Sequence, residues 1–142
     1  MTFYQDFKVR DYECDMQGIV NNAVYQQYLE HARHEFLLSH GLSFAELTEK
    51  GVFIVVAKIE INYRQSLRSG DEFSVSVAIK RPSKVRIVFE QTINRGEEKI
   101  LDAIVTTTAV NERNRPYFPN EFANLLGPVV EEIKKPPLRA GV

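Results

Sequence analysis

From Val52 onward, the spacing of hydrophobic residues along this chain changes from a helical repeat to a strand repeat. Over residues 22–40, apolar side chains recur three and four positions apart, which predicts an amphipathic helix. Its buried face would consist of Tyr25, Tyr28, Leu29, Ala32 and Phe36. Asparagine is a preferred N-cap, so we expect the helix to begin at Asn21 or Asn22 and to end before Gly41.

Before and after this helix the pattern is mostly that of strands. Residues 3–10 alternate apolar and polar side chains and predict a first strand. Residues 43–51 carry the capping-box spacing of a second, short helix. Four further strands, separated by turn signals, are expected near residues 53–63, 73–79, 85–93 and 100–110.

Short turns between consecutive strands require antiparallel neighbours. The predicted fold is therefore of the α+β class, with one antiparallel sheet packed against one long helix. We expect a single domain over residues 1–142, with its core within about residues 3–112. The tail 113–142 contains most of the chain's 6 prolines and is expected to hold no central strand.

Composition narrows the class of function. The chain has 142 residues, 44% of them hydrophobic, and a net charge of −1, so nothing in its overall charge points to a nucleic acid or an anionic membrane as partner. A single cysteine fits a reducing compartment. The sequence shows neither a signal peptide nor the roughly 20 apolar residues of a membrane span, which predicts a soluble, cytoplasmic protein.

Asp15 stands in a glycine-containing loop directly before the long helix. One interpretation is structural, because a turn aspartate often accepts hydrogen bonds from its own backbone. The other is chemical. A carboxylate near a helix N-terminus is stabilised by roughly 0.3–1 kcal/mol, and it can attack a carbonyl carbon or deprotonate a water there. Free N–H groups beside Asn22 would polarise the carbonyl oxygen, so capping and catalysis do not compete.

Two other kinds of catalytic site fit the spacing less well. A Cys14 nucleophile would need an imidazole, but His31, His34 and His40 lie one or more turns down the helix. His31 and His34 lack a third ligand at a recognisable spacing. We therefore expect no metal and no separate cofactor.

Cations cluster around the predicted turn after residue 80. Arg81, Lys84 and Arg86 are either a solvated face or a site for the phosphates of a nucleotide-tailed ligand. The chain has no phosphate-cradling glycine motif, nucleophile elbow or dinucleotide fingerprint.

Three segments carry a resemblance to a known family. Residues 12–25 are YECDMQGIVNNAVY, residues 28–33 are YLEHAR, and residues 63–71 are YRQSLRSGD. Together they resemble the hotdog-fold acyl-CoA thioesterases of the 4-hydroxybenzoyl-CoA thioesterase type, over about residues 5–112. The resemblance implies an antiparallel sheet wrapped around one long central helix. It also implies homodimers joined through that sheet, and often homotetramers.

The resemblance also implies roles for single residues. Asp15 falls on the catalytic carboxylate, which acts as nucleophile or general base, and the N–H of Asn22 falls where the thioester oxygen is polarised. Tyr25 matches the tyrosine of the first helical turn. Gly18 and Val20, in the same loop, are candidate substrate-binding residues. Many bacterial acyl-CoA members have histidine where this chain has Asn22, so histidine-assisted proton transfer is not expected at that position.

The implied function is hydrolysis of an acyl-CoA thioester to a free carboxylic acid and CoA, with CoA as part of the substrate. The phosphates of CoA would then be the ligand of the basic cluster. Three alternatives stay open: a thioesterase for acyl carrier protein, a hydratase or dehydratase, and a non-catalytic acyl-CoA-binding hotdog module. A hydratase favours a catalytic histidine in the loop, and this loop has none.

Overall fold

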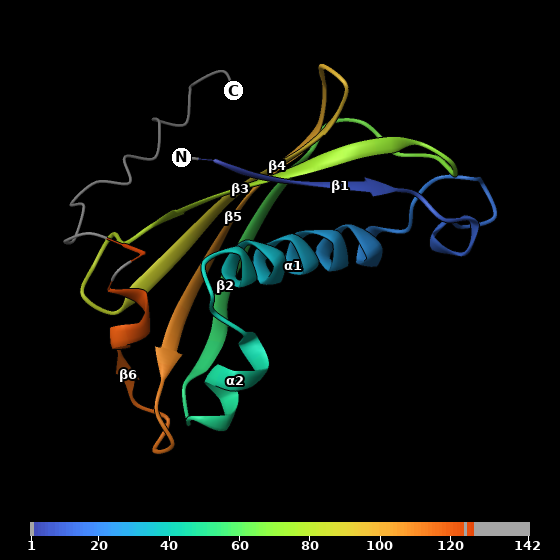
Figure 1. Ribbon diagram of the computed structural model, residues 1–142. Helices are drawn as coiled ribbons and strands as arrows, with labels where there is room; N and C mark the ends of the chain where they lie inside the picture. Colours follow the sequence, from blue (N-terminus) through green and yellow to red (C-terminus); the bar gives the residue numbers. More distant parts are fainter. Residues whose placement is uncertain (1, 124, 127–142) are drawn as a thin grey trace.

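The computed structural model describes residues 2–123, 125 and 126 as one curved sheet with a long helix against one face (Figure 1). The elements in chain order are β1 (Phe3–Lys8), η1 (Asp11–Glu13), α1 (Asn22–Ser39), α2 (Phe44–Glu49), β2 (Phe53–Tyr63), β3 (Glu72–Lys80), β4 (Arg86–Arg95), β5 (Glu98–Val110), β6 (Pro116–Tyr117) and η2 (Asn120–Phe122). The strand pairs between these elements are all antiparallel. The α+β prediction is confirmed.

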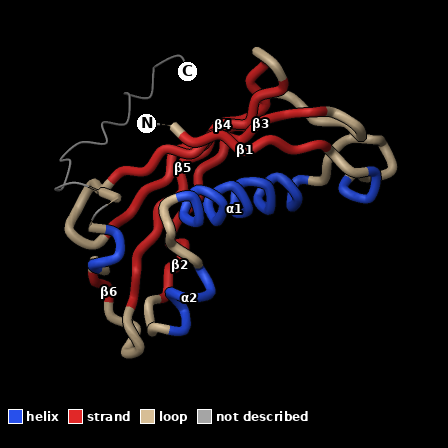
Figure 2. Tube along the Cα trace, in the orientation of Figure 1, coloured by secondary structure: helices blue, strands red, loops and turns tan. Residues whose placement is uncertain are grey.

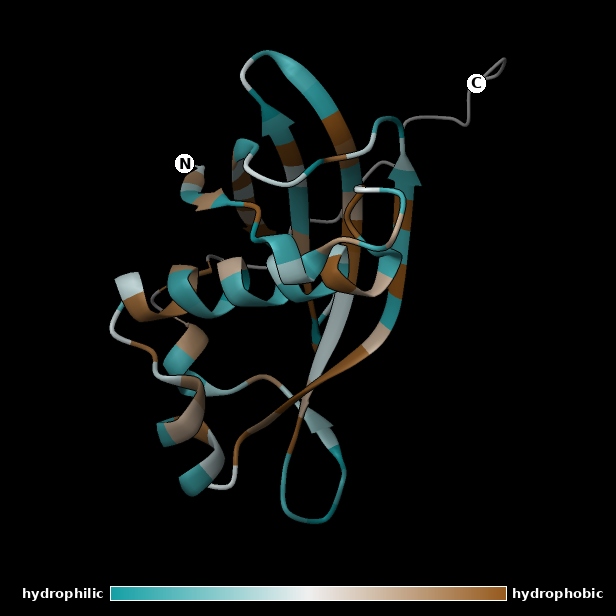
Figure 3. Cartoon of the chain, turned by 90° about the vertical axis from the view of Figure 1, so that its right-hand side faces the viewer, coloured by the Kyte–Doolittle hydropathy of each residue, from teal (hydrophilic) through white to brown (hydrophobic). Residues whose placement is uncertain are grey.

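The sheet has the order β1-β3-β4-β5-β2, and β6 pairs with the end of β5. Figure 2 shows the strands as one layer that curves around α1. Hydrophobic and hydrophilic residues alternate along the strands, as the colours of Figure 3 show. Alternate side chains of a strand point to opposite faces, so the apolar set of β3, β4 and β5 lies on the face that α1 covers.

Helix α1 begins where the asparagines predict it. Asn21 is the N-cap, and its side-chain oxygen accepts a hydrogen bond from the N–H of Ala23 at 3.3 Å. All five residues predicted for the buried face are buried, together with Arg33 and Leu37. Burying one large apolar side chain stabilises a fold by about 1.5–3 kcal/mol, so this stripe holds the helix to the sheet. No helix in the described part of the chain is long and apolar enough to cross a membrane.

The hydrophobic core extends past residue 112. Phe122 is fully buried and Leu126 is 7% exposed, and both belong to the main core cluster. Pro116 lies in the two-residue strand β6, which pairs only with β5 and therefore tolerates a missing N–H. The rest of the predicted tail, residues 127–142, lies outside the described residues.

Candidate active site

The loop before α1 is a narrow antiparallel turn. Cys14 and Val20 form a β-bridge, and the N–H of Asn21 donates to the carbonyl oxygen of Glu13 at 3.0 Å. Gly18 closes the turn with a φ of +80°, a conformation that side-chain-bearing residues rarely adopt. These contacts hold Asp15 in a hydrogen-bonded turn that leads into the N-cap of the helix.

The Asp15 carboxylate is exposed and fixed at one oxygen. Its Oδ1 accepts hydrogen bonds from the N–H of Gln17 at 2.8 Å and of Ile19 at 3.4 Å. Its Oδ2 has no hydrogen bond within the described residues. Both sequence interpretations of Asp15 therefore describe the same side chain: one oxygen builds the turn, and the other is open to a substrate or a water.

The start of α1 supplies a free donor. The side-chain oxygen of Asn21 accepts a hydrogen bond from the N–H of Ala23, and its backbone oxygen accepts one from the N–H of Val24. The N–H of Asn22 has no acceptor among the described residues. A backbone N–H at a helix start is suited to bind an oxygen that carries negative charge.

Tyr25 is buried at 2% exposure and ties a second loop to the helix. Its hydroxyl oxygen accepts a hydrogen bond from the N–H of Leu67 at 2.8 Å, and burial raises the pKa of its hydroxyl. Val20 donates its own N–H to the carbonyl oxygen of Leu67 at 2.9 Å. The geometry of Tyr25 therefore favours a role in positioning the Asp15 loop.

The Gly-Asp turn after β2 is held in place by hydrogen bonds to the side chain of Asp71. The carboxylate of Asp71 accepts hydrogen bonds from the N–H of Arg68 at 2.8 Å and from the guanidinium of Arg95 at 2.6 Å. Burial raises the pKa of Asp71, but these two hydrogen bonds outweigh burial and hold that pKa below its ordinary value. Ile19 forms a β-bridge with Arg68, so the clamped turn also supports the Asp15 loop.

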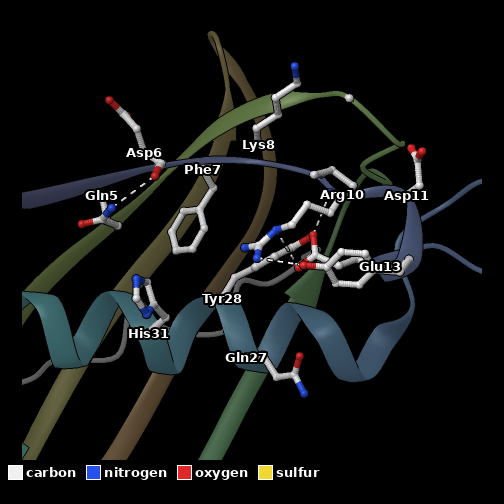
Figure 4. A pocket seen from close by; sticks show the side chains of 13 residues that line it. Gln5, Asp6, Phe7, Lys8, Arg10, Asp11, Glu13, Gln27, Tyr28 and His31 are labelled. Atoms are coloured by element: carbon white, nitrogen blue, oxygen red, sulfur yellow. Dashed lines mark hydrogen bonds and ion pairs between the residues drawn. The ribbon is translucent and has the colours of Figure 1, made fainter.

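Sequence reasoning missed the role of Glu13. Its Oε1 accepts hydrogen bonds from the Tyr28 hydroxyl at 2.8 Å and from the N–H of Arg10 at 2.9 Å (Figure 4). Burial, and then the bond to Glu13, raise the pKa of Tyr28. Tyr28 belongs to the predicted buried stripe, and a buried hydroxyl needs a partner. The predicted burial of Tyr28 was therefore the signal in the sequence that its hydroxyl would bond to a nearby group, and the structure shows that this group is the Glu13 carboxylate, which joins the loop to the helix.

A groove lies beside this network and not at Asp15. It occupies about 1200 Å³ between β1 and α1 and includes Phe7, Glu13, Tyr28 and His31 (Figure 4). Asp15 does not line it. Asp15 and Asn22 are both exposed within one copy of the chain.

The basic cluster lies far from Asp15. The connection between β3 and β4 and the Asp15 loop are at opposite ends of the sheet (Figure 1). The Arg81 guanidinium lies 3.5 Å from the centre of the Phe118 ring and donates to the carbonyl oxygen of Lys84 at 3.0 Å. The side chains of Lys84 and Arg86 have no partner among the described residues. Arg81 is thus engaged within the fold, and the other two cations are available.

The cysteine and histidines that were considered as a nucleophile or as metal ligands pack against other parts of the fold. Cys14 is half-buried, and burial raises the pKa of its thiol. His31 packs edge-on against Phe7, and His34 stacks on Phe44 with 4.4 Å between ring centres. No three histidine, cysteine or acidic side chains of the described residues come together as a metal site.

The family model of the thioesterase-like superfamily matches residues 9–126, which include the whole of this loop and helix. The chain belongs to the thioesterase-like superfamily. Membership is supported by a chloroplastic acyl-acyl carrier protein thioesterase, ATL2 of Arabidopsis thaliana, which is 42% identical over 113 residues. That match covers 78% of this chain but only 60% of the plant protein.

Other superfamily members match over more of their own length. The long-chain acyl-CoA thioesterase FadM of Escherichia coli is 30% identical over 106 residues, which are 73% of this chain and 80% of FadM. The crystal structure of a probable thioesterase from Bartonella henselae superposes with a TM-score of 0.78 at 27% identity. It covers 84% of this chain and 100% of that one. The hotdog fold implied by the sequence is confirmed.

Proposed function

We propose that this chain hydrolyses acyl thioesters, with acyl-CoA as the leading substrate class, to a free carboxylic acid and a thiol. The observation that carries the proposal is the pairing of Asp15 with the start of α1. Among the described residues, a carboxylate oxygen of Asp15 has no partner and the N–H of Asn22 has no acceptor, and the two lie at the two ends of one hydrogen-bonded loop. Relatives named as thioesterases support the same chemistry.

The reaction needs one base and one oxyanion site. As a general base, Asp15 takes a proton from water while the water oxygen attacks the thioester carbon. The N–H of Asn22 binds the developing oxyanion, the C–S bond breaks, and the proton reaches the leaving thiolate. As a nucleophile, Asp15 attacks the thioester carbon, the C–S bond breaks and the thiolate leaves, and water then cleaves the resulting mixed anhydride to the free acid and the Asp15 carboxylate. Removing one oxyanion donor typically lowers the rate by about 10²–10³, so in either route the helix start is as important as the carboxylate.

A panel of acyl-CoA and acyl-carrier thioesters, followed with a thiol reagent, tests the function. Release of thiol from at least one CoA thioester is the expected result. Turnover of carrier-bound substrates alone would favour the second candidate, a thioesterase for acyl carrier protein, for which the match to ATL2 is the supporting observation. Tight binding without turnover would instead identify a non-catalytic acyl-CoA-binding module.

We further propose that the working unit is a homodimer or homotetramer in the cytoplasm. β2 is an edge strand, and Val55 and Val56 on it are 45% and 47% exposed. An unpaired edge with exposed apolar side chains is a surface that proteins usually cover, and a second copy of the same strand can cover it. Such a partner would also close the open surface at Asp15 and bring a second basic cluster toward it.

Replacing Lys84 and Arg86 together with alanine should raise KM for CoA thioesters several-fold. Neither side chain has a partner in the described chain, and phosphates remote from the thioester contribute binding energy while the carbonyl is positioned. KM for short thioesters without the nucleotide should not change, and the double variant should sediment as the same oligomer as the wild type. An equal loss on both substrates would assign the two residues to structure, and no loss on either would make them ordinary surface charge.

A further inference from the structure

A groove follows the side of α1 that faces β2. It has a volume of about 340 Å³, and its walls include Ala23, Glu30 and Arg33 on the helix and Val56 and Ile59 on the strand. Because Ala23 follows Asn22, the groove begins beside the proposed oxyanion donor. A smaller cavity of about 60 Å³ shares Glu30, Arg33 and Val56 with it and therefore adjoins its far end.

Arg33 stands where the groove and the small cavity meet. The residue is only 9% exposed, and its guanidinium donates one hydrogen bond, at 3.0 Å, to the side-chain oxygen of Gln91. Gln91 is also buried, and its amide nitrogen donates to the carbonyl oxygen of Leu29 at 3.0 Å. The Gln91 side chain is thus held at both ends, and it fixes the direction of the guanidinium.

The charge of Arg33 has no counterion in the described part of the chain. No carboxylate lies within ion-pair distance of it there, and burial lowers the pKa of its guanidinium while nearby Glu30 raises it. A guanidinium has five N–H donors, and Gln91 takes one. The other nitrogens of Arg33 are not sealed off, because Nε of Arg81 is the one fully enclosed unpaired side-chain atom among the described residues. Arg33 lines both the groove and the smaller cavity. The guanidinium carbon also lies 6.0 Å from the centre of the Phe89 ring, a contact that uses none of its N–H donors. Buried N–H donors without an acceptor are costly, so the unused donors of Arg33 suit an acceptor from outside the chain.

We propose that Arg33 is the specificity-determining residue of an acyl subsite, which takes acyl chains bearing an oxygen acceptor, best a carboxylate, remote from the thioester. The proposal rests on the thioesterase function proposed above. Ten residues of helix separate Ala23 from Arg33, or about 15 Å along the axis, so the polar group belongs at the far end of a long acyl chain. Val56 and Ile59 would contact the methylene groups between, and the planar guanidinium matches a carboxylate with two parallel hydrogen bonds.

The test compares thioesters of equal chain length that end in a methyl, a hydroxyl or a carboxylate group, in wild type and in Arg33→Met. Methionine is apolar and follows the arginine side chain about as far as Nε. The substitution leaves the side-chain oxygen of Gln91 without its donor, which lowers stability, so a thermal melt of the variant accompanies the assay to confirm that it folds. Wild type should turn over the carboxylate-terminated substrate with a kcat/KM about 10- to 100-fold above that of the methyl-terminated one, as expected for a charged hydrogen bond. The hydroxyl-terminated substrate should fall between them. The preference should peak at one chain length.

Arg33→Met should abolish this preference: kcat/KM for the carboxylate-terminated substrate should fall by about 10- to 100-fold, and kcat/KM for the methyl-terminated substrate should not fall, since that substrate makes no charged hydrogen bond to lose. Arg113→Met, which removes an exposed cation from the turn after β5, is the matched control and should change neither value. Equal wild-type rates on all three termini would overturn the proposal. An equal loss of kcat/KM on all three substrates in Arg33→Met would also overturn it, because it would mark a structural role for Arg33. Dissociation of the Arg33→Met oligomer in sedimentation velocity would overturn it too, because it would mark a carboxylate of a second copy as the partner of Arg33. In each of these cases, hydrolysis of the methyl-terminated substrate would still support the proposed thioesterase function.

Discussion

Asp15→Asn should lower kcat by about 10²-fold or more while the protein stays folded, in line with the loss of an acid–base or nucleophilic group. Asparagine retains an oxygen that can accept the hydrogen bonds from the N–H groups of Gln17 and Ile19, so the turn is preserved. What the substitution removes is the negative oxygen that has no partner in the described chain. The measurement is the rate of thiol release, with circular dichroism and a thermal melt to confirm folding.

Cys14→Ser is the matched control for this variant. Cys14 neighbours Asp15, is half-buried and has a thiol pKa raised by burial, which disfavours a reactive thiolate. Its substitution should change kcat by only a few-fold, because no step of the proposed reaction uses the thiol. A folded Asp15→Asn protein with wild-type turnover would remove Asp15 from the mechanism, and an equal loss in Cys14→Ser would revive a cysteine nucleophile.

Phe122→Ala should lower the free energy of unfolding by about 3–5 kcal/mol, the usual cost of deleting a fully buried aromatic side chain. Phe122 is fully buried among the core residues although it follows the proline-containing segment. A urea titration of wild type and variant measures the difference.

Leu38→Ala serves as the control for the loss of Phe122. Leu38 lies on α1 but is 52% exposed, so its substitution should change stability by only about 0.5 kcal/mol. If Phe122→Ala were as stable as wild type, the segment after β6 would be an appendage, and the core would end near residue 112 as the sequence suggested.

Patterns that depend on neighbours in the chain predicted the local structure well. The repeat of three and four residues placed Tyr25, Leu29 and Phe36 on the buried face of α1, and all three are buried. The predicted range 53–63 coincides with β2 (Phe53–Tyr63). The cap at Asn21 was within the two alternatives that the sequence allowed. The physical reason is that helix caps, strand alternation and tight turns arise from backbone sterics and hydrogen bonds within a few residues.

The candidate site was predicted in part for the same reason. Asp15, Gly18 and Asn22 lie within eight consecutive residues, so their neighbourhood is local and the resemblance could identify it. The hydrogen-bond partners that hold this site in place are distant in the sequence. The Tyr25 hydroxyl accepts from Leu67, which is 42 residues away in the chain, and no spacing rule predicts that contact.

By itself, therefore, the sequence determined the elements, the face of α1 that is buried and the loop that carries Asp15. Only the tertiary structure decided which polar groups are engaged. Arg33 falls on the buried face of α1, yet its contact with Gln91 spans 58 residues. Arg81, a candidate for phosphate binding by sequence, lies over the ring of Phe118 from the segment after β6. A cation in a sequence pattern can be solvated, paired or poised for a ligand, because its free energy depends on burial and on partners that only the folded chain brings together.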